Sequence, residues 1–376
     1  MKQFCLAIAA ICAAATPVSA QDGVRAIISF NGSPDATVVT GAGGSVVDAI
    51  PSANALVANV PPGRIGRIRG AANVRSVEED AVANATAQST PWGISQIGAN
   101  SVWSATTGSG VRVAVVDTGI QNDHPDLSPR VTLGPTYVNG TQTSKDDNGH
   151  GTHCAGTIGA TNNTTGVVGV APGCSLLAVK VLDRRGSGYY SAIINGIDYA
   201  SNSSQGNARV INLSLGGTAD VQALHDAIDR AVTDRGVVVC AAAGNSGDTA
   251  GNPVNYPGAY ETAICVAATD SSDARAYFST YGAQVDVAAP GLSINSTWTK
   301  SGYKTISGTS MATPHVCGSA ALLIGSGLIS DRSGNGFNND EVRSRIESTS
   351  TLYPSRTDGL GYGRISASAA ISAGAN

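Results

Sequence analysis

The chain has 376 residues and a formal net charge of −4, with 42% hydrophobic and only 5% aromatic residues. This length can bury the core of one large domain and one small domain. The weakly acidic charge gives no basic footprint for nucleic acid, so a nucleic-acid-binding function is not expected.

The first twenty residues have the pattern of a secretory signal peptide. Lys2 makes a short positive start, an apolar run follows from Phe4 to Ala15, and Val18-Ser19-Ala20 offers a small-residue cleavage site. An anchor helix is the alternative, but the apolar run is too short to span a bilayer, and no later segment is long and apolar enough to span one either. We therefore expect residues 1–20 to be a signal peptide and the mature protein to be secreted and extracellular, without a membrane anchor.

Residues 21–86 are expected to form a separate small unit. Its pattern favours strands and helices in the order 25–30 (strand), 36–44 (weak helix), 55–60 (strand), 61–70 (helix) and 74–80 (strand). We read these five elements as part of a β-α-β-β-α-β order, which suits a small α+β, ferredoxin-like module. Its core would be marginal without a partner, although an independent accessory domain is an alternative. A small, polar joint follows at 83–91, where proteolysis would be easy.

From Val111 onward, apolar and β-branched runs alternate with helical patterns. The runs expected to be strands are 111–116, 176–182, 210–214, 237–242, 264–268 and 285–288, and helical stretches lie at 150–160, 190–200, 219–235 and 316–324. The strands are apolar on both faces, as in a buried parallel sheet. The expected fold class is therefore α/β, a three-layer αβα sandwich with a mostly parallel sheet.

Three polar residues lie at the ends of predicted elements, where α/β folds of this kind usually have their active sites. Asp117 ends the first strand, His150 opens a glycine-flanked helix, and Ser310 opens another helix. A hydroxyl is a weak nucleophile that needs a base, and the base needs an acceptor that fixes its tautomer. A serine in the first turn of a helix also stands at the positive end of the helix dipole, although a simple capping serine fits that place too.

The stretches around these residues carry a family resemblance. Asp117-Thr118-Gly119, His150-Gly151-Thr152-His153-Cys154-Ala155-Gly156 and Gly308-Thr309-Ser310-Met311-Ala312-Thr313-Pro314 resemble, in this order, the three active-site signatures of the subtilisin-like serine proteases. The resemblance covers the chain from Ala87 to its C-terminal region. It implies a catalytic domain over 87–376 with subtilisin-like fold and serine endopeptidase activity.

The resemblance also implies a role for each site residue. Ser310 would be the nucleophile, His150 the general acid and base, and Asp117 the carboxylate that orients the histidine. Asn245, in Ala243-Gly244-Asn245-Ser246-Gly247, would donate its side-chain amide to the oxyanion together with the Ser310 backbone N–H. A loop asparagine beside a glycine is the alternative interpretation of Asn245.

Substrate binding follows from the same resemblance. The backbone of Ser214, Leu215, Gly216 and Gly217 would hold an extended peptide as an added strand. Small residues and an uncharged floor would leave room for a large apolar or aromatic side chain in the primary pocket, lined by Gly216, Gly217, Ala243, Gly244 and Asn255. Tyr190 and Ile193 would line a further apolar subsite, although a core role for Ile193 is an alternative. We expect broad endopeptidase specificity with an apolar or aromatic preference.

A structural calcium site is implied by two stretches that resemble the family's tight calcium site. The expected ligands are the side chains of Gln88, Asp126 and Asn163 and the carbonyls of Thr161, Thr165 and Val167. All are oxygens, which suit a hard cation, although a polar surface loop is the alternative. Asp286 could serve a second, weaker site.

The unit at 21–86 resembles the inhibitory prosegment of this family. We expect the chain to be made as a zymogen, processed by its own activity between Thr86 and Ala87, with the prosegment as an intramolecular inhibitor. Its other partners would be protein and peptide substrates, and it would act as a monomer. Cys154, one helical turn after His150, would be a buried thiol that could make the enzyme sensitive to mercurials. Because five of the seven cysteines follow the signal peptide, at least one would be free or pair between chains.

Other hydrolase classes fit less well. An aspartic protease needs a second Asp-[Ser/Thr]-Gly, which this sequence lacks. An α/β-hydrolase has the histidine last in its triad order, and a zincin needs a glutamate that is missing beside His150 and His153. A catalytically silent binding protein on the same fold would be expected to have lost at least one of the four site residues.

Overall fold

The computed structural model describes residues 23–81, 87–249, 253–350 and 359–375. The chain divides into two compact units, Met1–Ala85 and Thr86–Asn376. The expected signal peptide lies outside the described residues, and so does Thr86 of the expected processing bond. Among the helices of the described part, none combines the length and the apolar character that crossing a membrane would need.

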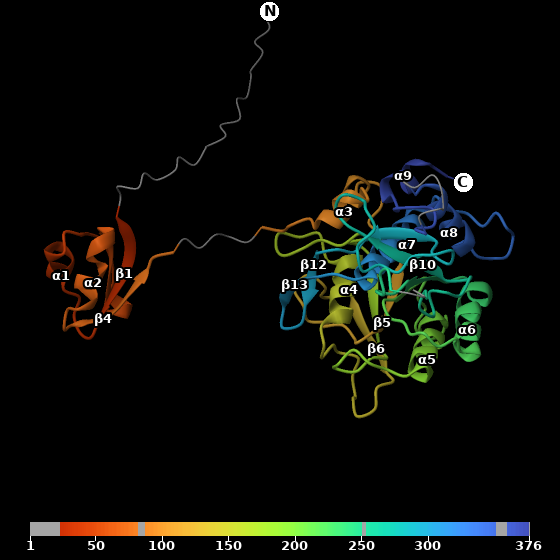
Figure 1. Cartoon of the computed structure of the whole chain (residues 1–376), viewed down its shortest axis with the longest axis horizontal. Coiled ribbons are helices and arrows are strands. Elements are labelled where there is room, and N and C mark those ends of the chain that lie inside the picture. Colours follow the sequence, from red (N-terminus) through yellow and green to blue (C-terminus); the bar gives the residue numbers. More distant parts are fainter. Residues whose placement is uncertain (1–22, 82–86, 250–252, 351–358, 376) are drawn as a thin grey trace, which may run out of the picture. The chain divides into compact units, whose positions relative to one another are not determined.

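The small unit is an antiparallel sheet with two short α-helices (Figure 1). Its elements are β1 Val24–Phe30, α1 Ala36–Gly41, β2 Ser45–Ile50, η1 Pro51–Ala53, β3 Ala55–Val60, η2 Pro62–Arg64, α2 Ile65–Arg69 and β4 Val74–Glu79. The strand order is β2-β3-β1-β4. Ile28, Phe30, Val39 and Ile68 are fully buried in one apolar cluster. The expected small α+β fold is confirmed.

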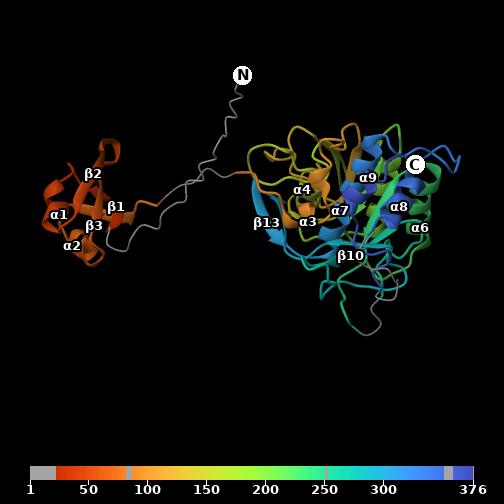
Figure 2. The ribbon, with the colours of Figure 1, turned by 90° about the horizontal axis from the view of Figure 1, so that it is seen from above.

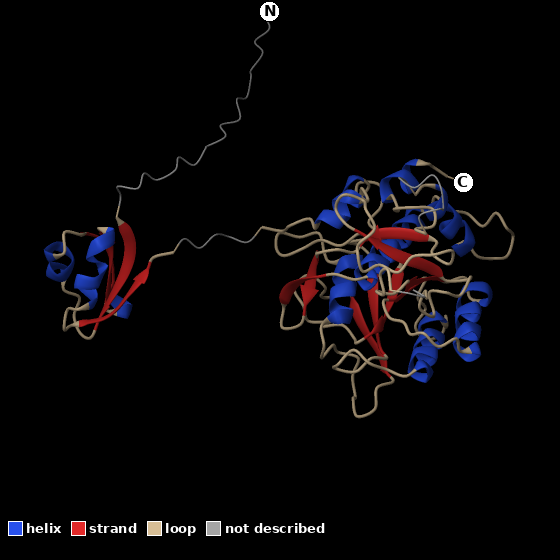
Figure 3. Cartoon of the chain, viewed as in Figure 1, coloured by secondary structure: helices blue, strands red, loops and turns tan. Residues whose placement is uncertain are grey.

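The larger unit is built on a seven-stranded, wholly parallel sheet with the order β11-β10-β9-β8-β5-β7-β6. Its strands are β5 Arg112–Asp117, β6 Val131–Thr136, β7 Ser175–Lys180, β8 Val210–Leu213, β9 Val238–Ala242, β10 Ile264–Thr269 and β11 Val287–Pro290. The sheet runs through the middle of this unit with helices on either side (Figure 3). The expected three-layer sandwich is confirmed.

Two apolar clusters cover the two faces of the sheet. Because side chains alternate along a strand, Val113 and Val115 of β5 belong to one cluster, whereas Ala114 and Val116 belong to the other. The first face packs against α4 His150–Gly159 and α7 Thr309–Ser326, and the second against α5 Tyr190–Ser201 and α6 Gln222–Asp229. In Figures 1 and 2, α4 and α7 lie close together. The residues that open α4 and α7 therefore approach the carboxyl end of β5.

Several elements escaped the sequence-based expectations. They are β2, β6, the antiparallel hairpin of β12 Ile294–Trp298 and β13 Gly302–Ile306, the short segments α3 Trp92–Gln96 and η3 Ala99–Ser101, and the helices α8 Asn339–Ser348 and α9 Ala367–Ser372, whereas η4 Arg230–Asp234 falls within the helix expected at 219–235. β2 and β6 are edge strands, and β6 contains Gly134 and Pro135, which lower strand propensity. The five cysteines of the larger unit are all buried free thiols.

Candidate active site

Asp117 and His150 meet at the carboxyl end of the central strand β5. His150 Nδ1 lies 2.8 and 2.9 Å from the two carboxylate oxygens of Asp117. The carboxylate is fully buried, while a quarter of the imidazole side chain is exposed. Because a carboxylate only accepts hydrogen bonds, Nδ1 donates and Nε2 is the nitrogen left for a proton exchange with another group.

The start of α4 is fixed so that this pair can form. The Asp146 carboxylate accepts hydrogen bonds from the backbone N–H groups of Asn148, Gly149 and Thr152. A side chain on Gly151 would collide with the carbonyl of Gly119, so glycine there lets the helix approach β5 closely. Caps of this kind satisfy N–H groups that the first helical turn leaves without partners.

The surroundings of His150 favour its protonated form. Burial lowers its pKa, but the negative charge and hydrogen bond of Asp117, helped by the charge of Asp146, outweigh this effect, so the pKa lies above the ordinary value of 6.5. The same charges stabilise an imidazolium that would form when His150 takes a proton. The arrangement suits a general base whose cation must be supported during a reaction.

Ser310 lies in the first turn of α7, and its backbone is held by groups from two other elements. Its carbonyl accepts hydrogen bonds from Ser214 Oγ at 2.8 Å and from Cys154 Sγ at 3.5 Å. α7 begins at Thr309, before the expected helical stretch 316–324, so Pro314 lies inside the helix. A proline has no N–H, so it leaves the carbonyl four residues earlier without its helical partner, and that carbonyl is the one of Ser310.

The Ser310 hydroxyl donates to the Ser214 carbonyl at 3.1 Å. Within the described residues, no hydrogen bond joins this hydroxyl to His150. Both side chains nevertheless line one cavity of about 550 Å³, together with Ser214 and Gly216. The structure thus brings Asp117 and His150 into contact and Ser310 into the same cleft. A serine hydroxyl rotates readily, and catalytic hydrogen bonds often tighten only when substrate is bound.

Asn245 faces the start of α7 from the loop after β9. Its Oδ1 accepts hydrogen bonds from the backbone N–H and the hydroxyl of Thr309, at 2.9 and 3.1 Å. The amide group Nδ2 is therefore left as a donor. A Cβ on Gly308 would lie 3.6 Å from the Ser310 backbone nitrogen and 3.8 Å from Asn245 Nδ2. The two donors thus flank one small space, which a side chain at residue 308 would occupy.

The residues expected to bind substrate, other than Gly217, fall into two groups. Ser214, Leu215, Gly216, Tyr190 and Ile193 line the cleft with His150 and Ser310. Gly244 and Asn255 meet behind Gly216, and the Asn255 N–H donates to the Ala243 carbonyl at 2.9 Å. Ile193 lines this cleft and is also buried in the core cluster beneath α5.

The expected peptide-binding backbone needs one correction. Gly217 exchanges two backbone hydrogen bonds with Tyr256, at 3.0 and 2.8 Å, so its N–H and C=O are already paired. Leu215 and Gly216, by contrast, have no backbone hydrogen bond to any other described residue. The open backbone edge therefore covers a shorter segment than expected.

The residues expected to hold calcium are brought together around the side chain of Gln88. Gln88 Nε2 donates to the Thr161 carbonyl, the Val167 carbonyl and Asn163 Oδ1, at 2.7, 3.0 and 3.2 Å. Asn163 Nδ2 and the Val167 N–H donate to the fully buried Asp126 carboxylate. Thr165 donates to Asn163 Oδ1 through its N–H and its hydroxyl, at 2.8 and 3.5 Å. Converging neutral and anionic oxygens fit a hard cation, with the Gln88 amide turned to present its oxygen.

Asp286, considered for a second cation site, is already paired within the protein. Its Oδ1 accepts a hydrogen bond from Arg343 Nη2 at 2.8 Å, and its Oδ2 accepts one from the Cys265 N–H at 2.8 Å. This arrangement offers no free oxygen pair to a cation, so Asp286 is a structural ion-pair residue.

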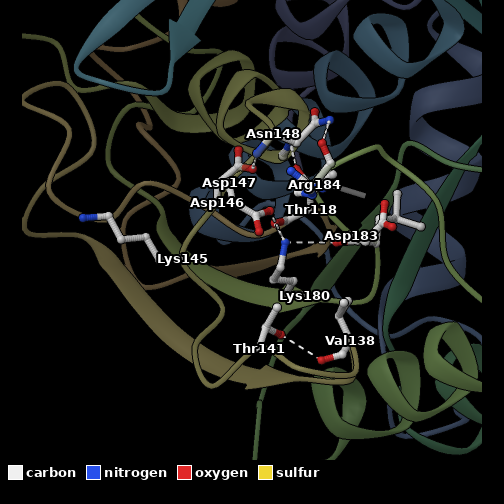
Figure 4. A network of polar contacts seen from close by, with 12 residues as sticks. Thr118, Val138, Thr141, Lys145, Asp146, Asp147, Asn148, Lys180, Asp183 and Arg184 are labelled. Carbon is white, nitrogen blue, oxygen red and sulfur yellow. Dashed lines mark hydrogen bonds and ion pairs between the residues drawn. The ribbon is translucent and has the colours of Figure 1, made fainter.

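Lys180 is a member of the site region that the sequence analysis missed. Its side chain is 1% exposed, and Nζ donates to Asp147 Oδ1, the Thr118 carbonyl and the Leu182 carbonyl, at 2.6, 2.6 and 3.0 Å. Figure 4 shows this amine between the loop before α4 and the segment after β7. A lysine inside an otherwise apolar strand was the available signal, because a buried charge needs such partners.

Cys154 is a buried residue next to the pair formed by Asp117 and His150. Its thiol, the His150 ring and the Asp117 carboxylate lie within 4.8 Å of one another. Burial, with the charge of Asp117, raises the pKa of this thiol well above its ordinary value, so Cys154 is protonated at neutral pH.

Comparison with known proteins shows which family this chain resembles. Residues 108–363 match the Subtilase family. Subtilisin E of Bacillus subtilis (strain 168) is 45% identical over 336 residues, which cover 89% of this chain and 84% of the relative. Thermitase of Thermoactinomyces vulgaris is 47% identical over 281 residues, covering 74% and 95%. An alkaline protease of Shouchella clausii is 46% identical over 295 residues, covering 78% and 73%.

Proposed function

The chain belongs to the subtilase family and is a subtilisin-like serine endopeptidase, and from this premise we propose that Asp117, His150 and Ser310 carry the reaction through an acyl-enzyme intermediate. The observation that supports this assignment best is the bond from His150 Nδ1 to the buried Asp117 carboxylate, at 2.8 Å, in the cleft that Ser310 lines. Each of the three residues then has a distinct task.

The reaction starts when the Ser310 hydroxyl turns from the Ser214 carbonyl toward His150 Nε2. His150 accepts the hydroxyl proton while Ser310 Oγ attacks the carbonyl carbon of the peptide, and Asp117 stabilises the resulting imidazolium. The Ser310 N–H and Asn245 Nδ2 donate to the oxyanion. The imidazolium then gives its proton to the leaving amine. In the second half, His150 takes a proton from water as the water oxygen attacks the acyl carbonyl carbon, and it gives that proton to Ser310 Oγ as the ester bond breaks and the acid product leaves.

Substrate would bind as an extended strand along the edge of Leu215 and Gly216. Their backbone groups have no partner among the described residues, and an unpaired edge is a template for an added strand. The side chain before the scissile bond would enter the space beside Gly216, Gly244 and Asn255. That lining carries no charge, which supports an apolar or aromatic preference and broad specificity.

We further propose that calcium binds at the loop of Gln88, Asp126 and Asn163, with the carbonyls of Thr161, Thr165 and Val167 as further ligands. Bound there, the cation would neutralise the Asp126 carboxylate and tie the segment near Gln88 to the loop at 161–167. Its contribution would be structural, because the catalytic groups need no metal for the steps above.

The small unit at 21–86 is proposed to be an inhibitory prosegment, removed by cleavage between Thr86 and Ala87 after secretion directed by residues 1–20. The support is the prosegment resemblance and the separate compact core of this unit. The mature enzyme, 87–376, would act as a monomer on proteins and peptides.

A pair of variants tests the proposed nucleophile. Ser310→Ala removes the hydroxyl in the cleft, whereas Ser319→Ala removes a buried hydroxyl on the same helix, which donates to the His315 carbonyl at 2.9 Å. We expect Ser310→Ala to abolish peptide hydrolysis and Ser319→Ala to retain it. Retained hydrolysis in purified Ser310→Ala would remove this assignment.

A further inference from the structure

The cleft contains one permanent charge among the described residues that line it, and this charge is positive. It belongs to Arg185, in the segment between β7 and α5, which lines the same cavity as His150, Ser310 and Gly216. The remaining lining residues are polar, apolar or glycine, apart from the titratable imidazole of His150. A substrate bound in this cleft therefore lies near one permanently charged group, the cationic side chain of Arg185.

The turn that carries Arg185 is held in one conformation by its own hydrogen bonds. Asp183 Oδ1 accepts the N–H groups of Arg185 and Ser187, at 2.8 and 3.1 Å. The Asp183 N–H donates to the Ser187 carbonyl, and the Gly186 N–H donates to the Asp183 carbonyl. These hydrogen bonds hold the backbone of Arg185 in place beside the cleft.

Two side chains of the active-site region anchor the same turn (Figure 4). Asn148 Nδ2 donates to the Arg184 carbonyl at 3.0 Å, and Lys180 Nζ donates to the Leu182 carbonyl at 3.0 Å. Asn148 also caps the start of α4, because its Oδ1 accepts the His150 N–H. The arginine turn and the catalytic histidine therefore share a support, which holds the backbone of the turn at a fixed place relative to the reacting groups.

The guanidinium of Arg185 is free to bind a second carboxylate. Its Nε lies 3.6 Å from Asp183 Oδ2, and the side chain is 79% exposed. No described residue forms a hydrogen bond with its terminal nitrogens. The planar end of an arginine can bind a carboxylate through two parallel N–H groups, so a partner from the substrate can be added without breaking an existing bond.

We infer that Arg185 gives this enzyme a preference for peptides with an aspartate or glutamate on the acyl side of the scissile bond, beyond the residue in the primary pocket. The inference rests on the proposed function. Gly216 belongs both to the proposed primary pocket and to the open backbone edge, so the peptide on this edge is the part before the cleaved bond. Arg185 lines that part of the cleft, whereas the primary pocket keeps its uncharged lining.

The test uses internally quenched peptides that differ at one position. Each of the second, third and fourth residues before the scissile bond carries Glu, Gln or Lys in turn, and kcat/KM is measured at low ionic strength and in about 1 M salt, where the Debye length is about 3 Å. The variants are Arg185→Gln and Arg185→Glu. Arg184→Gln is the matched control, because Arg184 is an exposed neighbour that does not line the cavity.

At one of these positions, wild type and Arg184→Gln should cleave the Glu peptide about threefold to fivefold faster than the Gln peptide, as expected for a solvent-exposed ion pair. The Lys peptide should be slower than the Gln peptide, and high salt should reduce both differences. Arg185→Gln should lose the preference and Arg185→Glu should reverse it. The inference would be overturned if Arg185→Gln kept the same preference for the Glu peptide as wild type. It would also be overturned if Arg184→Gln lost this preference.

The Gln peptides separate this inference from the proposed function. If wild type hydrolyses them in a reaction that a sulfonyl fluoride stops, but shows no Glu preference at any position, the role of Arg185 is refuted and the serine mechanism stands. If wild type hydrolyses none of the peptides, the proposed function itself fails, and the inference about Arg185 fails with it.

Discussion

Ser214 and Ser310 exchange two hydrogen bonds, one in each direction: the Ser214 hydroxyl donates to the Ser310 carbonyl at 2.8 Å, and the Ser310 hydroxyl donates to the Ser214 carbonyl at 3.1 Å. The first bond holds the backbone of the proposed nucleophile where Pro314 has removed a helical partner. The second bond holds the hydroxyl until substrate draws it toward His150. Ser214 thus connects the nucleophile to the backbone segment of Leu215 and Gly216, where substrate is proposed to bind.

Replacing Ser214 by alanine should loosen the start of α7. The Ser310 carbonyl would keep only the weak Cys154 donor, so we expect the free energy of unfolding to fall by about 1 kcal/mol and kcat to fall as well. Ser296→Ala is the control, since its buried hydroxyl donates to the His153 carbonyl at 2.8 Å, away from the cleft. Chemical denaturation and steady-state kinetics measure both effects. A fall in kcat that is equal in the two variants would contradict a positioning role.

Asn245 should act through Nδ2 alone. Asn245→Asp keeps an oxygen for the two Thr309 donors but removes the Nδ2 donor, whereas Asn245→Ala removes both. We expect kcat to fall by about 10²- to 10³-fold in both variants with little change in KM, a range carried over from the equivalent donor in a subtilisin, a relative of this chain. Near-normal kcat in Asn245→Asp would show that Nδ2 does not contact the oxyanion.

The pH dependence of kcat/KM should report His150. The histidine must be neutral to accept the serine proton, so activity should rise with pH through a pKa above 6.5, because Asp117 and Asp146 raise it in spite of burial. Asp117→Asn removes the main charge, so the acid limb should move to lower pH while kcat falls about 10⁴-fold, as in other serine-protease triads, subtilisin among them. An acid limb that stays at the same pH in Asp117→Asn would contradict the pairing.

Two buried histidines should make the fold sensitive to acid. Burial lowers the pKa of His153 and of His315 to about 4, so both are neutral in the native state. The unfolded chain binds these protons near pH 6.5, so their contribution is present above that pH and is lost as the pH falls toward about 4. Urea denaturation between pH 7 and 4 should show falling stability. His315→Asn should flatten this slope, and an unchanged slope would contradict the assignment.

Calcium should stabilise the protein through Asp126. A chelator should lower Tm, and restoring calcium at about 100 times its Kd should return about 2.7 kcal/mol. Asp126→Asn should lose this calcium-dependent gain, whereas Asp123→Asn, an exposed aspartate paired with Lys145 in the same segment, should keep it. An equal gain in Asp126→Asn and wild type would place the cation elsewhere. Thermal unfolding with and without calcium gives the comparison.

The sequence predicted the parts of the fold that depend on local pattern. Strands such as 111–116 and 264–268 were predicted because both faces of a central strand are buried, and that leaves an apolar run, which only Arg112 interrupts in these two strands. Edge strands β2 and β6 lack such a run, and the hairpin of β12 and β13 is stabilised by contacts with α4 rather than by its own pattern. Their existence depends on neighbours that are distant in the sequence.

The site was predictable to the extent that motifs specify residue types. The motifs led to Asp117, His150 and Ser310, but they contain no information on which acceptor the Ser310 hydroxyl bonds or which carbonyl Pro314 leaves open. The pairing of Gly217 with Tyr256 and the burial of Lys180 are equally tertiary facts, set by how loops from different strands meet. These contacts need the folded chain.

The most direct test of the account is covalent labelling of the nucleophile. Purified enzyme would be titrated with a sulfonyl fluoride, the residual hydrolysis of a chromogenic peptide measured, and the modified residue located by peptide mapping and mass spectrometry. We expect one adduct per molecule, on Ser310, with activity lost in proportion to labelling and no adduct in Ser310→Ala. Full activity after labelling would contradict the assignment of Ser310 as the nucleophile. Loss of activity with the adduct located on a different residue would contradict it as well.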